Sequence, residues 1–268
     1  MFKKSYGFIC FMLGFLVLLS CGKRVKKQDL GPDQYFEYAK SKFDKGHYLE
    51  AVTEFTVITL RYSGDPVIDD AQYYLAESHF KQKDYLIAIS EYQKLIHDYP
   101  QSPYRELAQF KIGLSYYHLS LRPELDQEYT KKSIRAFQDY VEENPKHELK
   151  GKAEEYILKL RKKLAKKHLL AATTYRKMGE YEAAVIYYDL LLEKYYDTQP
   201  AKEAQFWKGE VLYKLKKYPA ALNAFTAYVE KYPDHAYAEK AKKRISKLSE
   251  IIQSTETAPP APNEASRN

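Results

Sequence analysis

Small and aromatic residues recur along this chain at a spacing that predicts stacked pairs of helices. The most regular stretch is 83–100, KDYLIAISEYQKLIHDYP, in which Ala88 is followed four positions later by Tyr92. Residues four positions apart lie on the same face of a helix. Four further copies of this pair are Ala51 with Phe55, Ser133 with Phe137, Ala184 with Tyr188, and Ala221 with Phe225. The pattern predicts five copies of one amphipathic helix.

A second small residue precedes each of these pairs and predicts a partner helix. It lies twelve positions before the first small residue in four copies, and Gly113 takes its place in the third copy, which carries an insertion. The other four are Ala39, Ala76, Ala172 and Gly209. Small residues that face each other let two helix backbones approach closely. Each copy is therefore expected to be an antiparallel helix pair joined by a short turn.

This arrangement resembles the tetratricopeptide repeat, in which small, aromatic and Pro positions recur with a period of about 34 residues. Successive copies here are separated by 37, 45, 51 and 37 residues. Pro100, Pro145 and Pro233 close three copies, because the fixed φ and missing N–H of proline stop a helix. The sequence therefore predicts an all-α solenoid of about five helix-turn-helix units over residues 33–252. A last helix, over about 237–252, is expected to cap the stack.

Two segments depart from the regular repeat. The third copy carries the insertion LSLRPELDQEYTKK, residues 119–132, between its two helices. The fourth copy begins inside a long helical run, 152–178, that contains no Gly or Pro. We therefore expect an extended loop in the third unit and an unusually long helix after it.

The amino terminus is predicted to be a lipoprotein signal peptide, residues 1–20. Two lysines precede an apolar run from Phe8 to Leu19 that is short for a membrane span. The run ends in LLSC, which resembles the lipobox of bacterial lipoproteins, whose mature chain starts at a lipid-modified Cys. Cys21 is therefore the predicted lipidation site, and the alternative is an uncleaved signal anchor. By resemblance to enterobacterial sorting, Gly22 favours the outer membrane.

Two segments outside the repeats are predicted to lack a packed core. Residues 21–32 read as a lipidated tether, with a solvated linker and a contact with anionic head groups as its two possible roles. Residues 253–268 lack apolar periodicity and are rich in Pro, Ala and polar side chains. We expect this segment to be a disordered tail.

Net charge and cysteine content limit the classes of partner and of cross-link that this chain could have. The formal charge is +7 for the whole chain, and it is lower by two after cleavage because Lys3 and Lys4 leave with the signal peptide. This mild excess does not indicate nucleic acid as a partner. The only cysteines are Cys10 and Cys21, so no disulfide framework is available even in an oxidising compartment.

The sequence contains no pattern typical of an enzyme. The seven His are scattered without metal-ligand spacing, adjacent carboxylates point about 100° apart on a helix, and phosphate-binding and nucleophile motifs are absent. We therefore expect neither catalytic residues, nor a metal, nor a cofactor.

Aromatic residues on the first helix of four of the five copies form a candidate peptide groove; the fourth copy has Leu169 and Arg176 instead. One ring lies three positions before the small residue and a second lies seven positions further on. The predicted groove residues are Phe36, Phe43, Tyr73, Phe80, Phe110 and Tyr117, with Phe206 and Tyr213 in the fifth copy. The tetratricopeptide resemblance implies that such positions line the concave side, where they could take an extended peptide between polar neighbours such as Lys40 and Glu77. The alternative for each ring is a place in the core.

Two basic runs, RKKLAKK at 161–167 and KAKKR at 240–244, are further candidates. Such runs are most often solvated helix faces. Their alternative role is to face an acidic partner or the membrane.

The lipobox, the five repeats and the third-copy segment 116–149, YYHLSLRPELDQEYTKKSIRAFQDYVEENPKHEL, together resemble the BamD family of outer-membrane β-barrel assembly lipoproteins. The resemblance covers roughly residues 18–250. It implies a non-enzymatic scaffold anchored by acylated Cys21 in the outer-membrane lipid, on the periplasmic face.

The resemblance also implies two partners. A BamA-like barrel protein would dock through its POTRA domains on 152–178 and the fifth repeat, where the candidate docking residues are Arg161, Lys163, Lys167 and Arg176. Unfolded outer-membrane proteins would present a terminal targeting strand to the amino-terminal repeats.

Two other functions stay open at this stage. One is a periplasmic tetratricopeptide adaptor for cell-wall synthesis or division, of the kind associated with the Tol system; Cys21 and the absence of a coiled-coil pattern in 23–32 count against it. The other is a surface lipoprotein that captures nutrients, for which extensive insertions would be expected.

Overall fold

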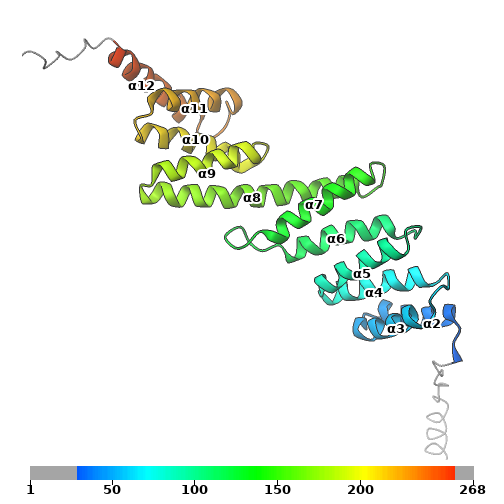
Figure 1. Ribbon diagram of the computed structural model, residues 1–268. Coiled ribbons are helices and arrows are strands. Elements are labelled where there is room, and N and C mark those ends of the chain that lie inside the picture. Colours follow the sequence, from blue (N-terminus) through cyan, green and yellow to red (C-terminus); the bar gives the residue numbers. More distant parts are fainter. Residues whose placement is uncertain (1–28, 257–268) are drawn as a thin grey trace, which may run out of the picture.

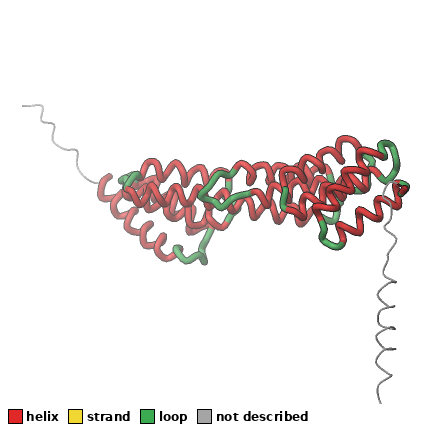
Figure 2. The backbone as a smooth tube through the Cα atoms, turned by 90° about the horizontal axis from the view of Figure 1, so that it is seen from below, coloured by secondary structure: helices red, strands yellow, loops and turns green. Residues whose placement is uncertain are grey.

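The computed structural model describes residues 29–256, and in this range the chain forms eleven α-helices and no strand. The helices alternate in direction and stack into an elongated solenoid, with α2 at one end and α12 at the other (Figure 1). Figure 2 shows the same stack from below as one extended body. The predicted all-α helix-turn-helix architecture is confirmed.

Ten of these helices form five antiparallel pairs, and the last one covers the end of the stack. The pairs are α2 (Pro32–Asp44) with α3 (Tyr48–Arg61), α4 (Ile68–Gln82) with α5 (Tyr85–Asp98), α6 (Arg105–Leu119) with α7 (Glu128–Glu143), α8 (Lys150–Met178) with α9 (Tyr181–Lys194), and α10 (Gln199–Lys214) with α11 (Tyr218–Lys231). The capping helix is α12 (Ala238–Glu256). Each helix packs on the next one along the chain, so the fold is built from neighbour contacts.

The repeated small and aromatic residues lie at the contacts between paired helices. The small residues of both helices and the five aromatic residues four positions after the second small residue are all buried. In the third pair the hydroxyl of Ser133 donates a hydrogen bond to the carbonyl of Gly113 at 2.8 Å. This bond shows directly that the two small positions face each other, as the sequence pattern predicts.

The two glycines among these positions are required by a close approach. A Cβ built on Gly113 would lie 2.7 Å from the ring of Phe137, and one built on Gly209 would lie 2.8 Å from the ring of Phe225. Contacts this short do not occur between unstrained atoms, so the ring or the helix would have to move. Glycine at these sites lets the aromatic ring lie directly on the helix backbone.

The turns inside four of the pairs share one backbone conformation. A residue with positive φ lies five positions before the second small residue, at Gly46 (78°), Lys83 (70°), Gly179 (84°) and Lys216 (58°). In each turn this residue and the next one donate N–H groups back to the preceding helix, as Lys83 and Asp84 do to the carbonyls of Phe80 and His79. Glycine adopts this left-handed conformation without cost, whereas lysine does not.

The structure refines three predicted boundaries. Only residues 120–127 of the predicted insertion are outside helices, because its remaining residues belong to the ends of α6 and α7. The long helix α8 begins at Lys150 and runs for 29 residues. The last helix α12 continues to Glu256, past the predicted end at 252.

Several predicted features lie outside the described residues. They are the signal peptide 1–20, Cys21, most of the tether and the tail from 257 onward.

The close approach at Gly113 and Gly209 makes a stability prediction. Gly113→Ala and Gly209→Ala should each lower the free energy of unfolding by about 1–2 kcal/mol, since overpacking outweighs the gain in helix propensity. Gly151→Ala is the matched control, because nothing lies within 4 Å of its added Cβ. It should leave stability unchanged or raise it by up to about 1 kcal/mol. Urea unfolding followed by circular dichroism measures all three, and equal stability of the three variants would contradict the packing argument.

Candidate functional site

The candidate groove lies on the face of the solenoid formed by the first helix of each pair, which we call the first-helix face. Helices α2 and α4, α6 and α8, and α8 and α10 touch along it. Two aromatic residues per helix were predicted here. The first ring position lies three residues before the small residue, and the second ring position lies seven residues after the first.

The rings at the first position pack mainly into the core. Tyr73 (6% exposed), Phe110 (3%) and Phe206 (3%) are buried, and only Phe36 is half-buried. Each ring packs on the aromatic residue of its partner helix, with centroid distances of 5.4 Å from Phe110 to Phe137 and 5.7 Å from Phe206 to Phe225. The structure thus places Tyr73 and Phe110 in the core, the alternative that the sequence left open for each ring.

The rings at the second position are half-buried and remain accessible at the groove. They are Phe43, Phe80, Tyr117 and Tyr213. Three of them pack on the Tyr that begins the partner helix, with centroid distances of 5.4 Å from Phe43 to Tyr48, 5.3 Å from Phe80 to Tyr85 and 5.8 Å from Tyr213 to Tyr218. Tyr117 packs instead on Tyr156 of α8 at 4.7 Å. Each ring is therefore held in place on one side.

A cationic side chain lies over every ring at the second position. The distances from the charged group to the ring centroid are 5.7 Å for Lys40 over Phe43, 4.8 Å for Lys111 over Phe80, 5.9 Å for Lys163 over Tyr117 and 4.8 Å for Arg244 over Tyr213. Cations within about 6 Å of a ring face are attracted to it. The groove therefore repeats one pair of groups, a half-buried ring with a positive charge beside it.

Neighbouring repeats are joined along this face by ion pairs. Lys111 of α6 lies 2.5 Å from the carboxylate of Glu77 on α4, and the Tyr92 hydroxyl donates to the same carboxylate. Burial and this negative charge raise the pKa of Tyr92 well above its usual value. Because Glu77 is 5% exposed, it is tied into the core and is not available to a peptide backbone.

A similar ion pair is found in the fifth repeat. Its carboxylate, Glu210, follows the small residue Gly209 directly, as Glu77 follows Ala76. Arg244 of α12 donates to both carboxylate oxygens of Glu210 at 2.7 and 2.8 Å. The arginine also faces a cavity of about 310 Å³ lined by Glu210, Lys240, Lys243, Arg244 and Lys247. Arginine and carboxylate groups match geometrically in such two-point contacts. This pair fixes the capping helix on the last repeat.

Sequence reasoning missed the residues that complete these cross-repeat contacts. Tyr74, Lys111 and Trp207 each lie two positions before the small residue of their helix. This common position in the repeat could have identified them from the sequence. Lys40 lies 4.8 Å from the centroid of Tyr74, and Arg176 lies 4.0 Å from the centroid of Trp207. In the fourth repeat, Arg176 therefore occupies the second ring position and stacks on Trp207 of the fifth repeat.

The four candidate docking residues all make contacts within the chain. Arg161 pairs with Asp197 at 2.6 Å and also reaches the carbonyl of Lys194 at 3.0 Å. Lys163 donates to the Ser120 hydroxyl at 2.7 Å and Lys167 to the Leu125 carbonyl at 2.8 Å. These two lysines hold the 120–127 loop on α8. Burial lowers the pKa of the Lys163 ammonium, as expected for a charge that is partly removed from water.

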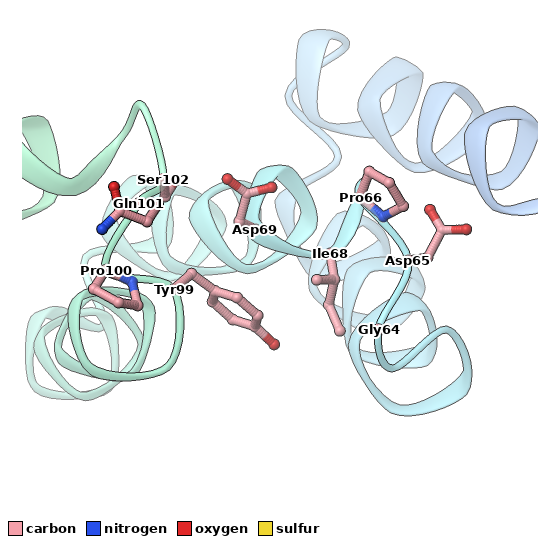
Figure 3. A pocket seen from close by; sticks show the side chains of 9 residues that line it. All are labelled: Gly64, Asp65, Pro66, Ile68, Asp69, Tyr99, Pro100, Gln101 and Ser102. Carbon is pink, nitrogen blue, oxygen red and sulfur yellow. The ribbon is translucent and has the colours of Figure 1, made fainter.

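A pocket at the loops between helix pairs contains none of the predicted residues. It has a volume of about 390 Å³ and lies between the loops that follow α3 and α5. In Figure 3 the ring of Tyr99 points across it toward Ile68. Among residues 29–256, no group of three or more His, Cys, Asp or Glu side chains is placed to hold a metal ion. Within this same range no helix is both long and apolar enough to cross a bilayer.

The fold defines a helical-repeat protein of the tetratricopeptide type. Over residues 28–221 the chain matches the model of the family YfiO, described as outer membrane lipoprotein. This match spans well over half of the sequence, so the chain belongs to this family of outer membrane lipoproteins. The predicted resemblance to BamD-type lipoproteins is confirmed at the level of the family.

Comparisons with other known proteins give weaker similarities. No curated protein sequence matches the chain. Among solved structures, the TPR2AB domain of yeast Sti1 in complex with pHSP90 is 16% identical with a TM-score of 0.42, over 84% of this chain and 86% of that one. The TPR domain of P58(IPK) is 17% identical with a TM-score of 0.40, over 84% and 67% of the two chains. A thermophilic TPR protein of Thermus thermophilus is 16% identical with a TM-score of 0.34, over 82% and 99%.

The environment of His168 on α8 predicts a pH dependence of stability. Burial and the surrounding lysines, Lys194 foremost, lower the pKa of His168 in the folded chain. The unfolded chain then binds more protons near the ordinary His pKa of about 6.5, so the free energy of unfolding should fall as pH decreases from 7 to 5. His79 and His118 act in the same direction, since burial lowers their pKa values as well.

The measurement is urea unfolding at pH 7, 6 and 5. His168→Gln should reduce the loss of stability over this range. His97→Gln is the control, because it makes the same exchange at a side chain that is 88% exposed, and His168→Gln should reduce the loss of stability more than this control does. If His168→Gln did not alter the pH dependence of the free energy of unfolding, this histidine would be equally easy to protonate in the folded and the unfolded chain.

Proposed function

We propose that this protein is a non-enzymatic scaffold of the outer-membrane β-barrel assembly machinery, held on the periplasmic face by lipid on Cys21. The observation that carries this proposal is the family match over residues 28–221. A solenoid of packed helices with a ring-lined face suits a scaffold, because such repeats offer long surfaces for other chains. The separate roles that we propose for the amino-terminal and the carboxy-terminal repeats are based on the geometry of the described residues.

The amino-terminal repeats are proposed to receive the terminal segment of an unfolded barrel protein. Phe36, Phe43, Phe80 and Tyr117 are half-buried, so each presents part of a ring that is already immobilised by its neighbours. Rigid, partly exposed aromatic residues lose little entropy on binding and are typical anchors for peptides. A lysine lies beside three of these rings, Phe43, Phe80 and Tyr117, with Lys111 4.8 Å from the Phe80 centroid.

This pairing of ring and cation fits one type of peptide end. A chain that terminates in an aromatic residue carries its carboxylate directly beside its ring. The aromatic side chain would pack on a groove ring while the carboxylate faces the lysine, which is an attractive charge contact at the edge of a hydrophobic site. Tyr73 and Phe110 would support such a site from the core rather than touch the peptide.

The carboxy-terminal half is proposed to dock on a BamA-like barrel protein through its POTRA domains. Helices α8 and α9 expose four large apolar side chains, Leu158 (56%), Leu170 (37%), Met178 (66%) and Ile186 (60%). The basic residues Arg161, Lys163 and Lys167 shape this region by holding its loops, as described above, and Arg176 orients it against the fifth repeat. Apolar side chains surrounded by charged neighbours are typical of interfaces between proteins.

The peptide site can be tested with a single ring. Phe80→Ala should weaken the binding of a synthetic peptide that ends in an aromatic residue by about 30-fold, the effect of losing a hot-spot side chain worth about 2 kcal/mol. Tyr213→Ala is the matched control, because it removes the ring at the same position of the fifth repeat and should leave affinity unchanged. Fluorescence anisotropy measures binding, and circular dichroism confirms that both variants are folded. Equal affinity of wild type and Phe80→Ala would place the peptide elsewhere.

The docking role is tested by photo-crosslinking in the intact outer membrane. A photoreactive residue at position 158 or 170 should trap a barrel protein that carries POTRA domains, identified by mass spectrometry. The control position is 60 on α3, where Leu60 is 76% exposed but lies in the first repeat. Recovery of peptidoglycan synthases or Tol components at 158 and 170, with no barrel protein, would favour the cell-wall adaptor instead.

A further inference from the structure

The solenoid has two long edges with different surfaces. The turns inside the five helix pairs all lie along one edge, and the loops that connect successive pairs lie along the other (Figure 1). We call these the turn edge and the loop edge. The turn edge is formed by residues 45–47, 83–84, 120–127, 179–180 and 215–217, together with the first and last residues of the adjoining helices.

Exposed apolar side chains are concentrated on the turn edge. Of the eleven large hydrophobic residues that are exposed in the described part of the chain, six lie there. They are Leu49 (71% exposed), Leu86 (55%), Ile87 (47%), Leu121 (48%), Leu125 (43%) and Met178 (66%). The loop edge has only two, Leu60 and Tyr196. Four successive repeats thus each contribute an apolar side chain to the same edge, which is unusual for a surface that faces only water.

The charges of the two edges also differ. Between the helices of the first four repeats, the turns carry three Lys or Arg residues and four carboxylates, whereas the loops that follow these repeats carry one Lys and three carboxylates. Lysines lie close in sequence to several of the exposed apolar residues, Lys45 to Leu49, Lys83 to Leu86 and Lys177 to Met178. Apolar side chains bordered by lysines are the pattern of surfaces that lie in the head-group region of a membrane. Anionic lipid would repel the loop edge more than the turn edge.

We infer that the turn edge of the first four repeats rests on the phospholipid surface of the membrane to which the chain is anchored. This inference rests on the proposed lipid anchor at Cys21. The anchor is close enough: eleven residue steps separate Cys21 from Pro32, and such a segment reaches at most about 40 Å. Helix α2 has 13 residues and is about 20 Å long. The tether can therefore start at the loop edge, where α2 begins, and still bring its lipid to the turn edge.

Membrane contact along this edge would orient the scaffold. It would lay the solenoid parallel to the bilayer, with the loop edge and its acidic residues toward the periplasm. The first-helix face, which runs between the two edges, would then stand open to the side and accept a peptide that approaches along the membrane.

The chain allows a direct test with site-specific labels. Cys10 and Cys21 are its only cysteines, and in the mature lipoprotein Cys21 is blocked by lipid, so one introduced Cys can be labelled alone. We choose Leu86→Cys and Met178→Cys on the turn edge. The matched control is Tyr196→Cys on the loop edge, because Tyr196 is 60% exposed and Leu86 is 55% exposed. Each variant carries an environment-sensitive fluorophore and is reconstituted as the full mature lipoprotein in vesicles of phosphatidylethanolamine and phosphatidylglycerol.

Flotation of the vesicles first shows that the lipid anchor is present. Nitroxide-labelled lipid should then quench the fluorophore at 86 and 178 by at least about twofold and leave the one at 196 unchanged. Introducing Leu49→Asp and Ile87→Asp together should abolish the quenching at 178, while circular dichroism shows that the fold is intact.

Three results would overturn the inference. Flotation without quenching at 86 would show that the edge is free of lipid, and would leave the proposed function standing. Equal quenching at 86 and 196 would show that the solenoid has no preferred edge on the membrane. Failure to float would remove the lipid anchor, and with it both the membrane part of the proposed function and the inference that depends on it.

Discussion

The whole solenoid depends on one contact, an aromatic ring that packs on the small residue of its partner helix. Phe55, Tyr92, Phe137, Tyr188 and Phe225 are all fully buried in this way. The ring needs a small partner because a larger side chain would hold the helices apart, and at Gly113 and Gly209 there is no room even for a methyl group. Burial of each ring contributes roughly 1.5–3 kcal/mol. The five contacts thus set both the spacing of the helices and much of their stability.

This contact also determines which aromatic residues remain partly exposed. A ring three positions before the small residue lies over the partner's aromatic residue and is drawn into the core, as Tyr73 and Phe110 are. A ring four positions after it lies closer to the turn and remains half-buried, as Phe80 does. One periodic sequence pattern therefore produces a mainly buried row and a half-buried row of rings on the same helix. The lysines over the second row make that row chemically distinct.

The sequence predicted the helix pairs well because their signals are local. Ala88 and Tyr92 are one turn apart, so their shared face follows from helix geometry alone. It could not predict that Glu77 is bound to Lys111, or that Lys163 reaches Ser120. Those contacts depend on the register between successive repeats and on the path of the 120–127 loop. For the same reason the lysines of 161–167 looked free in the sequence, whereas the structure shows two of them holding that loop.

The end of α12 shows a second limit of sequence reasoning. The apolar pattern stops near Ile252, but the helix continues to Glu256, where the hydroxyls of Ser254 and Thr255 bond to the carbonyl of Ile251. Local hydrogen bonds of this kind are made within the helix and do not require tertiary packing. At its other end α12 is fixed by Arg244 on Glu210. The last helix is thus held on the repeat before it by this ion pair together with the burial of Ala241 and Leu248. A stack built from neighbour contacts needs such a terminal link, because its last member has a partner on one side only.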